Sequence, residues 1–255
     1  MYIDTHAHLN MPEYSDLHSV LDRAKDSKVE TIINASYDIE SSHASVALAN
    51  NNQNIYAAVG IHPHDAQITS TATINEIRKL AANKKTLAIG ETGLDYFRCL
   101  VPKEVQQNSF RVFLQLAQEL SLPIIVHCRE ADQDVIRIMR EENRGTLRAV
   151  FHCFAGDENL MRFALDMGFM VSFTGNITFK KAGLLRERAR QIPINNLMIE
   201  TDCPYMSPEP FRGERNEPSN VVFVAQAIAN EKGLPVEEVA IATTQNARKF
   251  FNIPS

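Results

Sequence analysis

Two histidines near the N-terminus are the first residues whose spacing could do chemistry. His6 and His8 are two positions apart, so on an extended segment both imidazoles point to the same side, as two ligands of one metal ion must. An isolated pair of this kind at a strand end is more often structural. The metal interpretation therefore depends on whether other strand ends supply further ligands.

Further imidazoles and carboxylates do fall where short apolar runs end, namely at Glu91, His127, His152 and Asp202. Each histidine taken singly could be a hydrogen-bonded core residue. A buried histidine without a partner would lower the free energy of unfolding by about 1 to 3 kcal/mol. A carboxylate at Glu91 needs a counter-charge, which either a metal or Arg129 could supply. Nitrogen and oxygen donors together favour zinc, manganese or magnesium.

The end of the last apolar run offers a carboxylate for proton transfer as well as for ligation. Asp202 and Glu200 alternate along this run, so we expect them to share a face. That placement suits Asp202 as ligand or general base and Glu200 as its support. A Glu200 that only pairs with a buried cation remains an equal alternative. Of the two histidines that flank Pro63, we expect His62 to face the pocket, since it follows the apolar run first.

The elements that must position these residues are short buried strands that alternate with amphipathic helices. Eight apolar runs suit strands buried on both faces, at residues 2–4, 31–35, 55–60, 86–90, 123–126, 148–151, 169–173 and 197–200. The clearest helix is expected over 101–120. Alternation of this kind predicts a parallel barrel or an open doubly wound sheet. A length of 255 residues is that of one (β/α)8 TIM barrel, which we expect to form a single domain over 1–255.

Composition excludes several classes of protein. The hydrophobic fraction of 44% is globular, and the net charge of -5 argues against a protein that coats nucleic acid by charge alone. Four scattered cysteines, Cys99, Cys128, Cys153 and Cys203, are expected to be reduced thiols. No apolar run approaches the roughly 20 residues that span a bilayer. We therefore expect a cytoplasmic protein that does not associate with a membrane and has no obligate protein partner.

Several motifs along the whole chain resemble the TatD family of metal-dependent deoxyribonucleases, within the amidohydrolase-like superfamily. They are IDTHAHLN, VGIHPHD, AIGETGLDYFR, LPIIVHCRE, FHCFAG, ETDCPYMSPEPFRGERNEPSNV and TTQNARKFF. The resemblance implies a somewhat distorted TIM barrel that binds two divalent cations, Mg, Mn or Zn. By position, His6, His8 and Asp202 would hold one ion, His127 and His152 the other, and Glu91 would bridge them.

The activity implied by the resemblance is hydrolysis of DNA phosphodiester bonds, often from the 3′ end of single strands. Paired cations lower the pKa of a water to near 7, and Asp202 and Glu91 would be the catalytic residues, with Asp202 accepting the proton. Substrate contacts are expected from residues on the surrounding loops, namely His62, Arg129, Arg212, Arg215 and Asn216. Amide or ester hydrolysis on the same barrel is the nearest alternative, and a catalytically silent metal-stabilised module is another.

Overall fold

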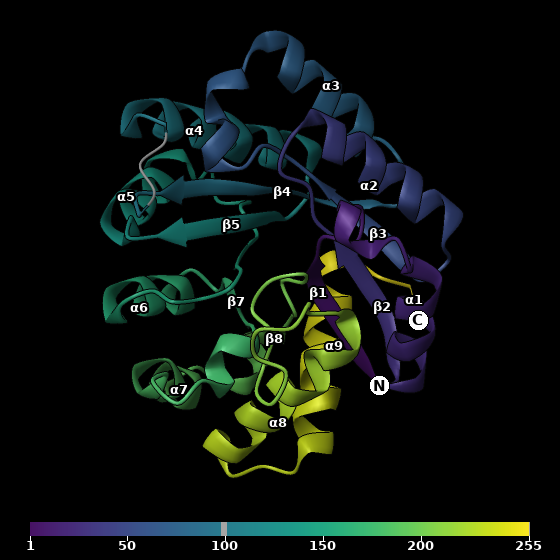
Figure 1. Cartoon of the computed structure of the whole chain (residues 1–255). Coiled ribbons are helices and arrows are strands. Elements are labelled where there is room, and N and C mark those ends of the chain that lie inside the picture. Colours follow the sequence, from purple (N-terminus) through teal and green to yellow (C-terminus); the bar gives the residue numbers. More distant parts are fainter. Residues whose placement is uncertain (98–100, 255) are drawn as a thin grey trace. The chain divides into compact units, whose positions relative to one another are not determined.

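The computed structural model describes residues 1–97 and 101–254, and these fall into two compact units. One unit joins the two ends of the chain, Met1–Asn34 and Met170–Ser255, and the other is the middle, Ala35–Phe169. Strands and helices alternate along the chain in both (Figure 1). The expected thiols at Cys128 and Cys203 are free, and Cys99 lies outside the described residues.

The terminal unit is built on four parallel strands. β1 pairs with β2, β7 pairs with β8, and a parallel bridge from Ala7 to Cys203 places the end of β1 beside the segment that follows β8. The first strand of the chain is thus a neighbour of the last, which distinguishes a barrel from an open doubly wound sheet. The elements are β1 Tyr2–Ala7, α1 Leu17–Asp26, β2 Val29–Asn34, β7 Met170–Phe173, α7 Gly183–Gln191, β8 Leu197–Ile199, α8 Val221–Lys232 and α9 Val236–Phe251.

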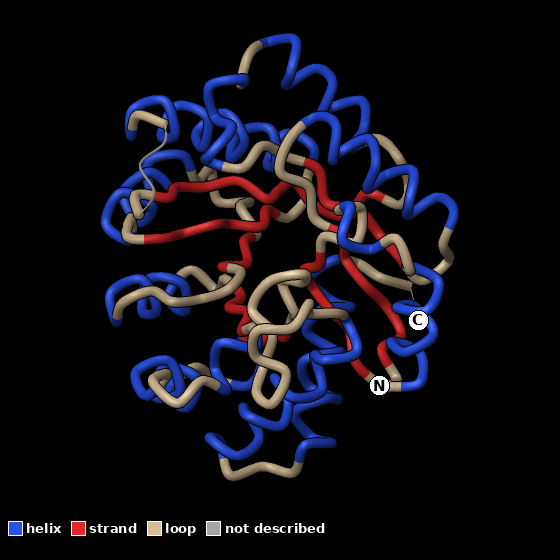
Figure 2. Tube along the Cα trace, in the orientation of Figure 1, coloured by secondary structure: helices blue, strands red, loops and turns tan. Residues whose placement is uncertain are grey.

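The middle unit carries the other four strands in chain order. β3 pairs with β4, β4 with β5, and β5 with β6, all parallel. In Figure 2 its strands, in red, are joined by helices, in blue. The elements are α2 Ile39–Asn51, β3 Ile55–Val59, α3 Thr71–Ala81, β4 Thr86–Asp95, α4 Lys103–Leu120, β5 Ile124–Arg129, α5 Asp132–Glu142, β6 Ala149–Phe151 and α6 Glu158–Asp166.

The alternating strands and helices confirm the predicted (β/α)8 class. The strands are irregular, because register shifts interrupt the pairs β1–β2, β3–β4 and β4–β5, and β6 and β8 have three residues each. Among the described residues, no helix is long and apolar enough to cross a membrane. That residues 1–255 act as one domain stays a prediction.

The predicted strand ends were wrong in two places that matter for the site. β4 continues through Asp95 and β5 through Arg129, so Glu91 and His127 lie inside strands. The pairing of β4 with β5 sets Gly93 opposite His127, and the pairing of β5 with β6 sets Val126 opposite Phe151. His127 directly follows Val126, and His152 directly follows Phe151. Parallel pairing therefore sets these two imidazoles at the same level.

Gly93 is required for the close approach of β4 to β5. A Cβ at this residue would lie 2.0 Å from the His127 carbonyl oxygen, and its φ of +147° is disfavoured for other residues. We expect Gly93→Ala to lower the free energy of unfolding by about 3 kcal/mol or more, through strain and overpacking. Gly183→Ala, at a helical site with nothing within 4 Å, should change it by less than about 1 kcal/mol. Equal urea midpoints for the two variants would contradict this account.

Candidate metal centre

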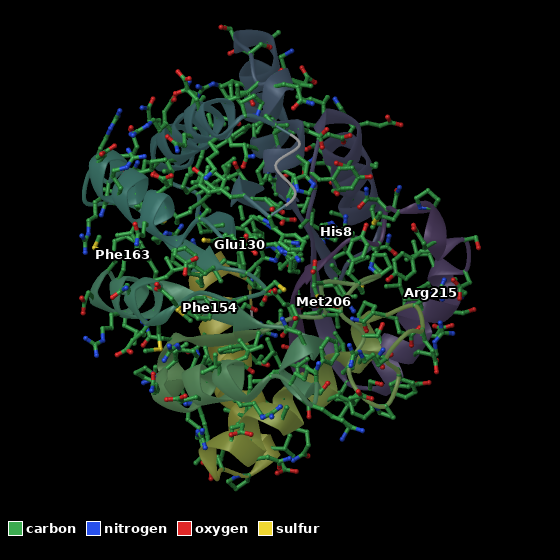
Figure 3. All side chains as sticks on the ribbon, turned by 60° about the vertical axis from the view of Figure 1, so that its left-hand side comes forward. His8, Glu130, Phe154, Phe163, Met206 and Arg215 are labelled. Atoms are coloured by element: carbon green, nitrogen blue, oxygen red, sulfur yellow. The ribbon has the colours of Figure 1, made fainter. Side chains whose placement is uncertain are left out.

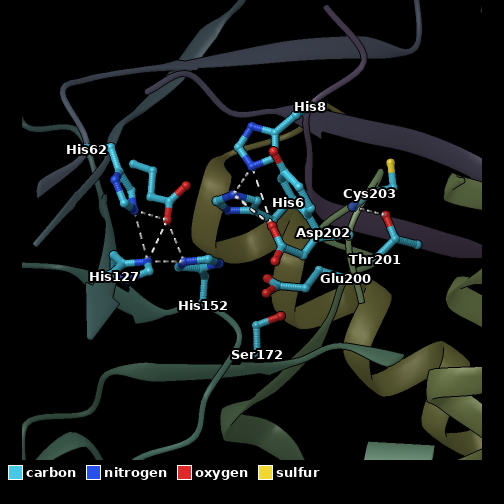
Figure 4. Close-up of polar contacts among 12 residues, drawn as sticks. His6, His8, His62, His127, His152, Ser172, Glu200, Thr201, Asp202 and Cys203 are labelled. Atoms are coloured by element: carbon cyan, nitrogen blue, oxygen red, sulfur yellow. Dashed lines mark hydrogen bonds and ion pairs between the residues drawn. The ribbon is translucent and has the colours of Figure 1, made fainter. Parts of the chain in front are cut away.

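The terminal unit brings His6, His8 and Asp202 together. The two imidazoles point to the same side, as their spacing predicts, with 3.2 Å between their Nε2 atoms. Asp202 Oδ1 lies 3.4 Å from His8 Nε2 and 3.8 Å from His6 Nε2. Figure 4 shows the Asp202 carboxylate facing both rings.

Backbone hydrogen bonds between β1 and the segment after β8 fix this group. The Asp202 N–H donates to the His6 carbonyl at 2.9 Å, and the His8 N–H donates to the Cys203 carbonyl at 2.9 Å. The expected alternation of Glu200 and Asp202 along one strand is wrong. β8 ends at Ile199, and Asp202 has a left-handed φ of +54°.

A buried carboxylate, Asp4, ties the same two segments together beneath the ligands. It is 0% exposed and accepts hydrogen bonds from the Thr201 N–H at 2.9 Å, the Thr201 hydroxyl at 2.6 Å and the His6 N–H at 3.3 Å. Burial raises the pKa of Asp4 to about 7, although these hydrogen bonds act to lower it. Sequence reasoning missed Asp4, and the available signal was its alternation with His6 along β1.

The middle unit surrounds the Glu91 carboxylate with imidazoles. Its Oε1 lies 2.7 Å from His152 Nε2, 2.8 Å from His127 Nδ1 and 3.5 Å from His62 Nε2. Figure 4 shows the rings of His62, His127 and His152 close to one another. His62 thus joins the ligand candidates of this unit, in agreement with the expectation that it faces the pocket.

Glu91 is buried, and the imidazoles around it keep its carboxylate ionised. Its exposure is 4%, and burial alone would raise its pKa. The charge of His152 and the hydrogen bonds from His127 and His152 outweigh burial and hold the pKa of Glu91 well below its usual range. These imidazoles take the counter-charge role for which Arg129 was the other candidate. Burial also lowers the pKa of His62 well below its ordinary value, which keeps that ring neutral and able to ligate.

Asp95 orients His127 from the side opposite Glu91. Its Oδ2 lies 3.3 Å from His127 Nε2 and 2.9 Å from His64 Nε2, and the residue is 2% exposed. With Nε2–H donating to Asp95, Nδ1 of His127 faces Glu91 and His152, and it could ligate a cation there once it carries no proton. Burial lowers the pKa of His127, but its bonds to Asp95 and Glu91 raise it above the ordinary value. Asp95 and His64 received no role from the sequence, although Glu91, Gly93 and Asp95 alternate along one strand.

Both groups have the donors and spacings of a divalent-metal site. Donors around one ion lie roughly 3.0 to 3.5 Å apart, given metal–ligand distances of about 2.1 Å. The donor pairs of the terminal group lie 3.2 to 3.8 Å apart. In the middle unit, His62, Glu91 and His127 also form a group that could hold a metal ion. The chain's residues therefore fit divalent cations in each unit.

The arginines predicted to bind substrate differ in their surroundings. Arg129 is exposed, with its guanidinium carbon 3.9 Å from the centroid of the Phe97 ring. Arg212 is also exposed and lies 4.4 Å over the ring of Phe179. Stacking on an aromatic face fixes a guanidinium while its edge can still donate hydrogen bonds.

The other two predicted substrate residues are engaged within the terminal unit. Arg215 forms a bidentate pair with Asp16, at 2.6 and 2.9 Å, and in Figure 3 it lies beside α1 and away from His8. Asn216 is 0% exposed, and its amide donates to the carbonyls of Thr201 and Tyr205. The structure thus gives Asn216 a place inside the fold, where it braces the segment after β8.

Comparison with known proteins identifies the family. The model of the TatD-related DNases matches residues 3–252. The chain belongs to this family. TatD relatives include the Bacillus subtilis protein named "uncharacterized metal-dependent hydrolase YabD", 43% identical over 99% of this chain and 100% of its own. A Pantoea ananatis relative named "3'-5' ssDNA/RNA exonuclease TatD" is 35% identical, with 94% of each chain covered.

Solved structures agree with the TatD assignment and with the fold class. YjjV, a TatD homolog from Escherichia coli, has a TM-score of 0.93 and 30% identity, with 99% of this chain and 98% of that one covered. A TatD family hydrolase from Entamoeba histolytica has a TM-score of 0.89 and 27% identity, with 100% and 98% covered. This protein is therefore a TatD family metal-dependent hydrolase with the barrel fold.

The buried carboxylate of Asp4 predicts a pH dependence of the metal-free protein. The folded state keeps the Asp4 proton up to pH about 7, whereas the unfolded chain releases it near 3.8. Between these values the free energy of unfolding should fall as pH rises, by at most about 1.4 kcal/mol per unit from this group.

Asp4→Asn mimics the protonated form of Asp4. The free energy of unfolding of this variant, relative to that of wild type, should therefore increase as pH rises from about 5 to 7. Urea unfolding of chelator-treated protein measures this difference, and Asp22→Asn, at an exposed aspartate of the same unit, is the matched control. Parallel pH profiles for wild type and Asp4→Asn would show that Asp4 is ionised in the fold at all these pH values.

Proposed function

We propose that this TatD family member hydrolyses phosphodiester bonds of single-stranded DNA, from the 3′ end, with two divalent cations, Mg, Mn or Zn. The observation that carries the proposal is the buried Glu91 anion within 2.7 to 3.5 Å of the nitrogens of three histidines. One cation would be held by His6, His8 and Asp202, the other by His127 and His152, and Glu91 would bridge them. The name of the 35% identical Pantoea ananatis relative supports this substrate class.

When bound, the cations would neutralise phosphate charge and lower the pKa of a water molecule to near 7. Asp202 suits the role of proton acceptor, because its side chain is 11% exposed and so reaches solvent. Asp95 would act by positioning, since it keeps the Nδ1 lone pair of His127 directed at the site. Asp4 would act in the same indirect way on the Asp202 segment.

Phosphate recognition is proposed for the two stacked arginines, Arg129 and Arg212, together with His62. A guanidinium offers a planar edge of N–H donors that matches phosphate oxygens. Arg215 and Asn216 would contribute through the segment that they hold: Arg215 anchors it to Asp16, and Asn216 anchors it to Thr201 and Tyr205.

A cytoplasmic location is part of the proposal. The free thiols of Cys128 and Cys203 support it, because reducing compartments keep cysteines in this state.

The proposal is tested with end-labelled oligonucleotides and the manganese-loaded protein. Wild type should shorten single strands from the 3′ end, and chelation should stop the reaction. Glu91→Ala should reduce turnover by at least about 100-fold, since it removes the shared anion of the site. Glu76→Ala, at an exposed pair with Lys79, is the matched control and should leave turnover unchanged.

A parallel panel of p-nitrophenyl phosphodiesters and small amides separates the reaction classes. Metal-dependent turnover of amides without cleavage of any phosphodiester would contradict the proposed substrate. A Glu91→Ala variant with the activity and metal content of wild type would contradict the proposed site.

A further inference from the structure

An exposed aromatic ring lies beside the His8 group in the terminal unit. Tyr205 is 52% exposed, and its ring centroid lies 6.3 Å from that of His8 with the planes at 68°. The Tyr205 hydroxyl lies 3.8 Å from Met11 Sδ, so the edge of the ring is engaged while half of its surface faces solvent. The exposed face of this ring is therefore available to a ligand that binds beside the His8 group.

The backbone that carries this ring is firmly held. The Tyr205 N–H donates to the Asp202 carbonyl at 3.0 Å, and its own carbonyl accepts from the buried Asn216 amide at 2.6 Å. Asn216 Nδ2 also donates to the Thr201 carbonyl at 2.9 Å, and Asn216 Oδ1 accepts from Asn220 at 2.9 Å. The backbone of Tyr205 is therefore tied through two hydrogen bonds to the segment that contains Asp202.

An exposed ring on a fixed backbone, with His8 and Met11 at its edge, suits a flat ligand that stacks on its open face. Stacking of a nucleobase on an aromatic side chain contributes about 1 to 3 kcal/mol and tolerates any base, because every base has a π-face. A preorganised platform adds affinity because little side-chain freedom is lost on binding. The distance to His8 places such a base next to a phosphate held at the metal group.

We propose that Tyr205 is the stacking platform for the nucleobase adjacent to the phosphodiester bond that is cleaved. The inference rests on the proposed nuclease function and adds to it a subsite for the base. It also explains the place of Asn216, whose buried amide fixes the platform and contacts the substrate only through Tyr205. Recognition at this subsite would be independent of base identity.

The experiment compares two substrates on manganese-loaded protein. One is a single-stranded oligonucleotide with natural nucleotides at its 3′ end, and the other carries abasic tetrahydrofuran residues at the same positions. Tyr205→Ala removes the ring and Tyr205→Phe retains it. Ile241→Ala, at a residue of similar exposure on α9, 57%, is the matched control.

We expect Tyr205→Ala to raise KM for the natural strand by about 10-fold, within the range that one stacked base gives, with kcat changed less than twofold. Tyr205→Phe and Ile241→Ala should retain the wild-type KM. The abasic strand should abolish the difference between wild type and Tyr205→Ala. Equal metal content of all variants, measured on the same samples, shows that the metal group is intact.

Three results would overturn the proposal. The first is an equal loss on natural and abasic strands, which indicates a role in the metal group instead of base stacking. The second is a Tyr205→Phe variant as weak as Tyr205→Ala, because the hydroxyl would then be the important group. The third is an unchanged KM for Tyr205→Ala on the natural strand.

Failure of the nuclease function itself gives a different pattern. If wild type cleaves neither strand, fluorescence anisotropy with the labelled natural strand measures binding directly. Weaker binding by Tyr205→Ala than by wild type and Ile241→Ala would then support the platform while the proposed reaction fails. Equal binding by all variants would overturn both.

Discussion

The structure of the middle unit depends on one buried anion, Glu91, and on the imidazoles that compensate its charge. A carboxylate that is 4% exposed is stable as an anion only with close partners. His127 and His152 supply them because the β5–β6 register pairs Val126 with Phe151 and so sets the residues that follow them level. The β4–β5 register brings β5 so close to β4 at Gly93 that no side chain fits there. Packing and electrostatics therefore constrain the same few residues.

In the terminal unit, backbone hydrogen bonds and a second buried carboxylate hold the ligand candidates in place. Its ligand candidates lie on two segments at opposite ends of the chain, and these are joined by reciprocal backbone bonds at His6 and His8. Asp4 adds a buried carboxylate that accepts three hydrogen bonds from Thr201 and His6. The cost of burying Asp4, visible in its raised pKa, is offset by fixing the backbone around Asp202. In both units, carboxylates without a proposed ligand role orient the ligand candidates.

Much of this arrangement could be predicted from local sequence patterns. Eight apolar runs were placed correctly because strands buried on both faces are continuous in sequence. The two-residue spacing of His6 and His8 fixed their relative direction, because side chains alternate along a strand. The strand ends were less predictable, since β4 and β5 continue into polar residues that only pairing between strands makes extended.

The residues that were missed act through long-range contacts. Asp4 and Thr201 are bonded across almost the whole chain, and nothing in the sequence near either residue indicates that contact. Asn216 was expected to contact substrate from a loop, but its amide is buried against two carbonyls. Asp95 carried a local signal, its alternation with Glu91, yet its function depends on the position of His127. A local pattern does not specify such tertiary contacts.

The most direct test of the central claim is electron paramagnetic resonance of the metal-free protein titrated with Mn²⁺. We expect two ions per chain and, at two equivalents, the spectrum of an exchange-coupled pair, because one carboxylate would bridge both ions. Glu91→Gln should remove the coupling. A wild-type protein that binds a single ion, or two ions without magnetic coupling, would contradict this claim.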